Sequence, residues 1–284
     1  MVRLGVIGGS GLYDLDGLTD VAEHRVETSW GVPSAPVVAG RLGELDLLFL
    51  PRHGVGHSLN PSEVPYRANI AALKRLGATH LLAVSAVGSL AEALPPRSLV
   101  CPDQLIDRTV GRPRTFFEDG VVGHVGVADP FDGRFRSALV AAAADVGIDV
   151  LDGATYVCIE GPQFSTRAES HLFRSWGATV IGMTAMPEAR LAREAGLPYA
   201  MLALVTDFDV WHETSEPVTV EMVIANLHAN SAAARAIIAA LGGRVDRLAA
   251  ITGSSPADAI VTRRDAISTE ARRRLAELGI ALGE

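Results

Sequence analysis

Short unbroken apolar runs alternate with longer amphipathic stretches along most of the chain. The most continuous run is Tyr199–Val205, and the absence of polar interruption is typical of a strand covered on both faces. Similar runs predict strands at residues 3–7, 37–39, 46–51, 80–85, 99–102, 155–159 and 179–182. Residues 103–108 are expected to open a long irregular segment that continues through 109–130.

Helical spacing of apolar residues and capping signals fill the stretches between several of these runs. Ser62 is expected to cap a helix that reaches Leu76, and Thr166 with Glu169 forms a capping-box pattern. Pro187 suits the first turn of a helix that ends near Ala195. Further helices are predicted over 134–146, 219–241 and 268–278.

The alternation of strands and helices predicts an α/β fold, with a central mixed, largely parallel twisted sheet flanked by helices. We see no internal repeat and no low-complexity linker, so we expect one domain over residues 1–242. After Gly242 the composition shifts toward arginine, and residues 243–284 are expected to form a helical tail. This tail is either a peripheral cover or a partly mobile end.

Composition narrows the class of protein further. Hydrophobic residues make up 48% of the 284, yet no apolar run reaches the 18 residues of a membrane span. The net charge of −8 argues against a nucleic-acid binder and requires a local cluster of donors for any anionic substrate. The first residues lack signal-peptide features, and Cys101 and Cys158 fit buried free thiols, so a cytoplasmic location is expected.

Five predicted strand ends carry unusual polar chemistry. Four of them offer hydroxyls, backbone amides or a guanidinium, which suit an oxyanion. The fifth offers two carboxyl groups, Asp207 and Asp209, which can accept from an amino group or donate a proton. An anion pocket beside an acid pocket indicates two substrates, or one polar substrate with two ends. The four anion-type ends hold Gly8 and Ser10, Arg52 and His53, Ser85 and Ala86, and Met183 and Thr184.

In its motifs the sequence resembles the trimeric purine nucleoside phosphorylase family, and most closely its branch that acts on 5′-methylthioadenosine. The resemblance runs from residue 5 to about residue 230, with the motifs in the family's order, and does not cover the tail after Gly242. The matching segments are GVIGGSGL (5–12), PRHG (51–54), NPSEVPYRANIAAL (60–73), VSAVGSL (84–90), DQLIDRT (103–109), IEGPQFSTRAES (159–170), VIGMTAMPE (180–188) and TDFDVW (206–211).

The resemblance implies a pentosyltransferase that converts 5′-methylthioadenosine and inorganic phosphate to adenine and 5-methylthioribose 1-phosphate. Phosphate is then a co-substrate, and no cofactor or metal is implied. The expected partners are a small nucleoside, phosphate and further copies of the chain in a trimer or a dimer of trimers, with no nucleic acid and no membrane. Broader or 6-oxopurine specificity, and action on adenosine or other 5′-substituted adenosines, are the alternatives.

The resemblance also implies roles for individual residues. The phosphate-site positions are Gly8, Ser10, Arg52, His53, Ser85, Ala86 and Thr184. Met183 matches the residue whose backbone binds ribose hydroxyls, and Phe164 matches the aromatic packed on base and sugar. Asp207 matches the acid facing N7 of the purine, and Asp209 the acid beside the 6-amino group.

Two implied roles compete with plainer interpretations. Val220, Val223 and Ile224 match the apolar wall around the methylthio group, but their spacing also fits ordinary core positions on a helix. His124 aligns with a histidine that reaches the neighbouring subunit's site, but a surface histidine is an equal interpretation. A nucleoside hydrolase that uses water in the same pocket, and a purine-binding protein without turnover, are the competing functions.

Overall fold

The computed structural model describes residues 1–9, 12, 15–212 and 220–282, and within these it leaves out the side chains of 220, 222–225 and 227–229. The strands of the described chain form one sheet. They are β1 (Arg3–Gly8), β2 (Thr19–His24), β3 (Val37–Leu42), β4 (Leu45–Pro51), β5 (His80–Ser89), β6 (Leu99–Cys101), β7 (Gln104–Arg108), β8 (Leu151–Asp152), β9 (Thr155–Ile159), β10 (Val180–Gly182) and β11 (Tyr199–Asp207).

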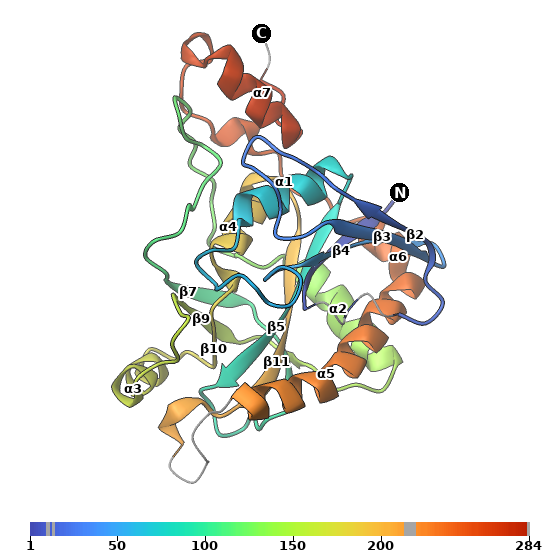
Figure 1. The fold of residues 1–284 in the computed structure, drawn as a ribbon, viewed down its shortest axis with the longest axis vertical. Coiled ribbons are helices and arrows are strands. Elements are labelled where there is room, and N and C mark those ends of the chain that lie inside the picture. The colour runs from blue at the N-terminus through green and yellow to red at the C-terminus, as the bar shows by residue number, and fades with distance from the viewer. Residues whose placement is uncertain (10–11, 13–14, 213–219, 283–284) are drawn as a thin grey trace.

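Helices flank this sheet on both faces (Figure 1). They are α1 (Tyr66–Arg75), α2 (Gly133–Asp145), α3 (Arg167–Ser175), α4 (Ala185–Glu194), α5 (Val220–Leu241), α6 (Val245–Ala249) and α7 (Thr269–Glu277). The strand order is β2-β3-β4-β1-β5-β10-β9-β7, and β11 pairs with β5 and β6. Parallel and antiparallel pairs both occur, which confirms the predicted mixed α/β sheet.

Alternate residues of β11 explain its unbroken apolar run. Ala200, Leu202 and Leu204 pack in the cluster formed with α2 and α5. Met201 and Ala203 pack on the opposite face, in the cluster formed with α1, α4 and α7. All residues of β11 are buried, so the prediction of a strand covered on both faces is confirmed.

Strand β5 differs from its prediction in a way that matters for the site. We expected the strand to end at Ser85, but it continues to Ser89. It first pairs in parallel with β1 and β11, and its last residues, Gly88 and Ser89, pair with the antiparallel β10. Its small residues therefore lie within a paired strand and not at the start of a turn or helix.

Three further expectations need correction. Residues 104–108 form strand β7, which pairs in parallel with β9, where we expected irregular structure. Strands β2 and β8 had not been predicted, because their residues are mostly exposed and carry no apolar run. Ser62 does not cap α1: its amide donates to Asn60 Oδ1 in a local turn, and the helix begins at Tyr66 after Pro65.

The other predicted helices are confirmed with small shifts at their ends. The capping box at the start of α3 is present, since the Thr166 and Glu169 side chains each bond the other residue's backbone. Regular helical geometry in α4 begins only after Met186, which places Pro187 at its start as expected. Ser268 caps α7, and α5 ends at Leu241.

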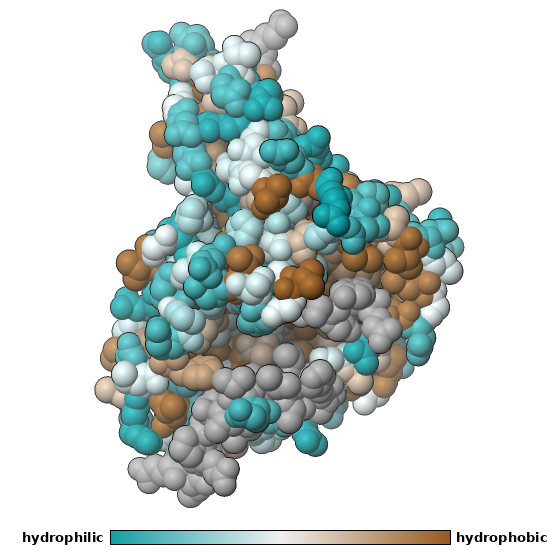
Figure 2. All heavy atoms as spheres, in the orientation of Figure 1, coloured by the Kyte–Doolittle hydropathy of each residue, from teal (hydrophilic) through white to brown (hydrophobic). Residues whose placement is uncertain are grey.

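The C-terminal segment and the irregular residues 109–130 lie side by side, at the upper end of the view in Figure 1. Gly123 and Ile260 form an isolated bridge, and Val261 N donates to Val122 O at 2.9 Å. Leu275 of α7 is buried in the cluster shared with α1 and α4. The C-terminal segment and residues 109–130 together form a projection, and Figure 2 shows that its outer surface is mostly hydrophilic. Within the described chain, no helix has the length and apolar character needed to cross a membrane.

Candidate active site

A cavity of about 820 Å³ opens beside β5 and β11, where several strands deliver polar residues. Its walls also come from the segments that follow β1, β4, β9 and β10, and from helix α5. The fold thus brings together ten of the residues singled out from the sequence: Gly8, Arg52, His53, Ser85, Ala86, Phe164, Met183, Thr184, Asp207 and Asp209.

Strand β5 sets the spacing between the two ends of this cavity. Ser85 pairs with Ala203, whereas Gly88 pairs with Asp207 after a register shift between Val205 and Asp207. Three residues of strand separate these levels, which corresponds to ~10 Å at about 3.3 Å per residue. The hydroxyl end and the carboxyl end therefore lie at two separate levels along the same strand.

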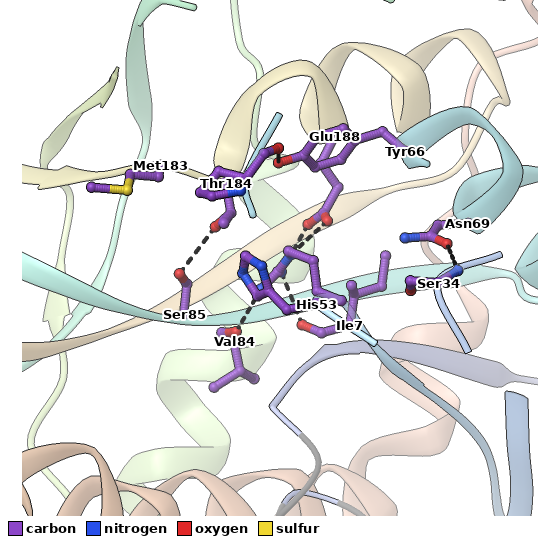
Figure 3. Close-up of polar contacts among 12 residues, drawn as sticks. Ile7, Ser34, His53, Tyr66, Asn69, Val84, Ser85, Met183, Thr184 and Glu188 are labelled. Carbon is purple, nitrogen blue, oxygen red and sulfur yellow. Dashed lines mark hydrogen bonds and ion pairs between the residues drawn. The ribbon is translucent and has the colours of Figure 1, made fainter. Parts of the chain in front are cut away.

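Hydroxyl groups from strand β5 and from the start of helix α4 meet at the first end. Ser85 Oγ lies 3.0 Å from Thr184 Oγ1, and Figure 3 shows the two side chains pointing toward each other from β5 and the start of α4. Gly8 closes β1 beside them, and a Cβ at this position would lie 2.4 Å from Leu12 Cδ1 and 3.1 Å from Val84 O. Glycine is therefore the residue that fits there.

Arg52 is buried at this end and is held from several sides. Its Nε and Nη2 bond both oxygens of Glu188, at 2.9 and 3.0 Å. Nη2 also donates to Ile7 O, and Nη1 donates to Val84 O (Figure 3). Four of its five N–H groups are thus used inside the protein, and one N–H of Nη1 is left for a ligand.

Glu188 offsets the charge of Arg52, and Tyr199 supports the pair. The Tyr199 hydroxyl donates to Glu188 Oε1 at 2.9 Å. Burial alone would lower the pKa of Arg52, but the adjacent Glu188 carboxylate raises it above its ordinary value. We expected the Arg52 guanidinium to face an anion directly, but its Nε and Nη2 bond the Glu188 carboxylate instead. Arg52 therefore offers an anion one N–H, and Glu188 largely compensates its charge.

His53 has a defined tautomer in this environment. Its Nδ1 lies 2.9 Å from Leu59 O, and because a carbonyl only accepts, Nδ1 carries the proton. Burial lowers the pKa of His53 to about 4, with a further contribution from Arg52. The ring is therefore neutral at pH 7, with Nε2 as an acceptor, and it stacks on His57 at 4.3 Å.

Asp207 and Asp209 form the second end of the cavity. Asp207 Oδ2 accepts from the Thr206 hydroxyl at 2.7 Å, and Oδ1 accepts from Asp209 N at 2.9 Å. That second bond accompanies a left-handed backbone conformation of Asp209, with φ 43°, which is uncommon for residues other than glycine. Burial raises the pKa of both carboxyl groups.

One oxygen at this end lacks a partner. Asp209 Oδ2 is buried and makes no hydrogen bond within the part of the chain that the structure describes. The Oγ of Ser165, which also lines the cavity, is in the same situation. Because unsatisfied buried polar groups are costly, these two atoms indicate where a ligand would supply a donor and an acceptor.

Phe164 and Met183 line the cavity between its two ends. Phe164 is 48% exposed, so it is not a core residue and its ring is available to a ligand. The Met183 carbonyl accepts from Arg112 Nη1 at 2.7 Å. The N–H of Met183 is thus the backbone group that it can offer to a sugar hydroxyl.

Five predicted site residues are not among the described residues that line the cavity. Ser10 lies outside the described residues, as do the side chains of Val220, Val223 and Ile224, whose backbone begins helix α5. His124 is exposed in the 109–130 segment, where its amide donates to Ala259 O, and it does not line the cavity of its own chain. Its reach into a neighbouring subunit stays a prediction.

The structure adds residues that the sequence reasoning missed. Asn60, Ser165, Ser231 and Arg235 line the cavity. Arg235 had a usable signal, because it is the one charged residue in the sequence between Glu221 and Arg244. Asn60 is the first residue of the matching segment NPSEVPYRANIAAL, to which no site role was assigned. Within the described residues, no three His, Cys, Asp or Glu side chains cluster so that they could hold a metal ion.

An α/β sheet with a pocket that pairs an anion-type end with a carboxyl end defines an enzyme acting on a small polar substrate with two ends. Residues 3–242 match the Phosphorylase superfamily, and the chain belongs to this family.

Named relatives agree with this assignment. The chain is 50% identical over 274 residues to an S-methyl-5′-thioadenosine phosphorylase of Geobacter sulfurreducens, with 96% of each chain covered. It is 49% identical to the enzyme of the same name from Thermosynechococcus vestitus, again with 96% of each covered. The predicted family resemblance is thereby confirmed.

Solved structures extend the similarity to the fold. A methylthioadenosine phosphorylase from an Antarctic soil metagenomic library has a TM-score of 0.92 and 48% identity, with 98% of each chain covered. A variant of the adenosine/methylthioadenosine phosphorylase of Schistosoma mansoni, solved with methylthioadenosine, has a TM-score of 0.82 and 38% identity. That comparison covers 88% of this chain and 96% of the other.

Proposed function

We propose that the protein catalyses the phosphorolysis of 5′-methylthioadenosine to adenine and 5-methylthioribose 1-phosphate. The observation that carries this proposal is the spacing of the two ends of one cavity along β5, with hydroxyls at Ser85 and Thr184 and carboxyls at Asp207 and Asp209. The names of its relatives and the bound ligand of the Schistosoma enzyme support the same substrate.

Phosphate binds at the hydroxyl end. Ser85 and Thr184 donate hydroxyl hydrogens to it, and backbone amides near Gly8 and Ala86 add further donors. Arg52 contributes its remaining N–H, while Glu188 and Tyr199 hold its side chain still. Nε2 of the neutral His53 ring can accept a hydrogen bond from a protonated phosphate oxygen.

Phosphate then attacks C1′ of the ribose as the bond to the purine N9 breaks. The sugar becomes cationic in this oxocarbenium-like state, and the anion beside it stabilises the charge. Met183 N–H binds a ribose hydroxyl, and Phe164 packs on the base and sugar. The bond between phosphate oxygen and C1′ forms as the purine leaves.

The leaving purine gains negative charge, and Asp207 relieves it by protonating or hydrogen-bonding N7. Burial raises the pKa of Asp207, so a larger fraction of it is protonated near neutrality than of an ordinary aspartate. General acid help of this kind is typically worth about 10²–10⁴ in rate. Asp209 Oδ2, which has no partner among the described residues, accepts from the exocyclic 6-amino group of adenine.

The 5′ substituent contacts the start of α5 in this proposal, where Val220, Val223 and Ile224 supply an apolar wall. Such a wall rejects an added hydroxyl only weakly. Adenosine and other 5′-substituted adenosines are therefore the alternative substrates.

We also propose that the chain works in the cytoplasm as a homotrimer or a dimer of trimers. Cys101 and Cys158 are buried and unpaired, which suits a reducing compartment. His124 and Val110 of the 109–130 segment are exposed, which is compatible with the proposed contact between copies. Light scattering on the purified protein measures the assembly, and a monomer would contradict it.

The test of the reaction is adenine release from 5′-methylthioadenosine with and without phosphate, with the sugar product identified. Phosphorolysis predicts strict phosphate dependence and one sugar 1-phosphate per adenine. Equal turnover without phosphate would identify a nucleoside hydrolase. Purine binding without any sugar phosphate would identify a binding protein.

A further inference from the structure

Arg112 is a buried cation for which the reaction described above has no use. It belongs to the irregular 109–130 segment, yet its side chain is fully buried. The nearest carboxylate is that of Glu160, whose Oε1 lies 3.6 Å from Arg112 Nε, and Nε makes no hydrogen bond within the described chain. Glu160 is therefore the counterion of Arg112, but it makes no hydrogen bond to Nε, and the donors of the guanidinium are used elsewhere.

Backbone carbonyls take most of the hydrogen bonds of this guanidinium. Nη1 donates to Met183 O at 2.7 Å and to Met186 O at 2.6 Å, on both sides of Thr184. Nη2 donates to Glu160 O at 2.6 Å, just after β9. Arg112 therefore ties the end of β10 and the first residues of α4 to the end of the neighbouring strand β9.

A second connection leads from Arg112 to the rim of the cavity. Nη1 lies 3.1 Å from the Tyr66 hydroxyl, which itself donates to Pro61 O at 2.9 Å. Pro61 and Asn60 line the cavity. The Arg112 side chain thus contacts Tyr66, which bonds the rim of the cavity at Pro61. It also bonds the backbone of the segment that carries Met183 and Thr184.

The geometry points to Arg112 as a positioning residue that holds the Met183 and Thr184 backbone where the cavity needs it. Because the peptide group is planar, a fixed Met183 carbonyl also fixes the direction of the Thr184 N–H and the position of the Thr184 Cα. The Thr184 side chain, which meets Ser85 Oγ at 3.0 Å, starts from that position. This inference rests on the proposed function, which places ribose at Met183 and phosphate at Thr184. Asp207 and Asp209 lie on and after β11, which Arg112 does not contact through any of these bonds.

The test compares Arg112→Met, Arg112→Lys and the control Arg114→Met, an exposed arginine of the same segment. Arg112→Met is expected to lower kcat/KM for 5′-methylthioadenosine by at least about 100-fold and to raise the phosphate KM by about tenfold or more. The dissociation constant of free adenine, measured by calorimetry, is expected to change less than about threefold. Arg114→Met is expected to match the wild type in all three.

Normal phosphate KM in Arg112→Met, or an equal loss of adenine and phosphate binding, would overturn the inference, since the second result indicates a general loss of structure. If Arg112→Met does not fold, Arg112→Lys decides: it keeps the charge but not the planar fork, so phosphate KM should still rise while adenine binding stays. A normal phosphate KM in Arg112→Lys would overturn it. Wild-type protein without phosphate-dependent turnover would instead refute the proposed function.

Discussion

Asp209 combines three features that rarely occur together: burial, a left-handed backbone and a carboxylate oxygen without a partner among the described residues. Strained, unsatisfied residues are retained where a ligand completes them. In the proposed function, the 6-amino group of an aminopurine donates to this oxygen, whereas the 6-oxo group of a 6-oxopurine cannot donate.

Asp209→Asn should therefore shift the base preference, because an amide can donate to a 6-oxo group. We expect the ratio of kcat/KM for 5′-methylthioadenosine over 5′-methylthioinosine to fall by about 100-fold or more. Steady-state assays on the two nucleosides measure the ratio. An unchanged ratio would show that Asp209 does not read the 6-position.

His53 makes the folding stability depend on pH. The pKa of His53 drops from its ordinary value of 6.5 to about 4 on folding, mainly because of burial. The unfolded chain therefore takes up this proton first as the pH falls, and the stabilising contribution present above pH 6.5 is lost between about 6.5 and 4. We expect a loss of about 2 kcal/mol from this residue across the window.

Urea denaturation of wild type and His53→Asn at pH 7.5 and 4.5 isolates this contribution. The buried acids Asp207 and Asp209, whose pKa values are raised, act in the opposite direction in both proteins and cancel in the difference. The variant should lose less stability on acidification than the wild type, and His171→Asn, at an exposed position of α3, should behave like the wild type. Identical losses in all three proteins would contradict the assignment.

At the scale of the elements, strand β5 is what aligns the two ends of the cavity. Its residue Gly88 lies against the acid end, and a Cβ there would lie 3.0 Å from both Asp207 Oδ1 and Ile181 Cγ2. The strand can pass this close to the carboxyl pair only because residue 88 has no side chain.

Gly88→Ala is expected to push Asp207 out of place. We predict a loss of about 1–2 kcal/mol in stability and a fall of about tenfold or more in kcat/KM. Thermal unfolding and steady-state kinetics measure the two effects. Gly133→Ala at the start of α2, where a Cβ meets no atom within 4 Å, is the matched control and should be neutral. Wild-type activity in Gly88→Ala would mean that the acid end does not depend on this close approach.

Local sequence signals predicted elements well where neighbours in the chain decide the structure. The capping box at Thr166 and Glu169 and the buried run of β11 are of this kind. The prediction that Ser62 caps α1 was wrong, because Ser62 N donates to Asn60 Oδ1 in a local turn and the helix begins only after Pro65. The continuation of β5 depends on its pairing with β10 and β11, which no local pattern reveals.

The site was predictable as a set of residue types but not as a network. Motifs indicated which residues would meet, and ten of them do line one cavity. The bond between Arg52 and Glu188 joins residues 136 positions apart, and Arg112 reaches Met183 across 71. Such contacts follow from topology, so the sequence could not show that the Arg52 fork is already occupied.

At the scale of the whole molecule, the C-terminal segment is part of the structure and not an appendage to it. Ala271, Leu275 and Leu278 are buried in the larger core cluster, and Glu277 accepts from Ser29 N at 3.0 Å. The segment also pairs with residues 122 and 123, so it supports the projection that carries His124. The site itself lies on the sheet, beside β5 and β11.

The most direct test of the central claim is a crystal structure of the protein with adenine and phosphate bound together. The account predicts phosphate in contact with Ser85 and Thr184, and the adenine ring with N7 at Asp207 and its amino group at Asp209. A purine bound away from these two carboxyls, or phosphate held elsewhere in the cavity, would contradict it.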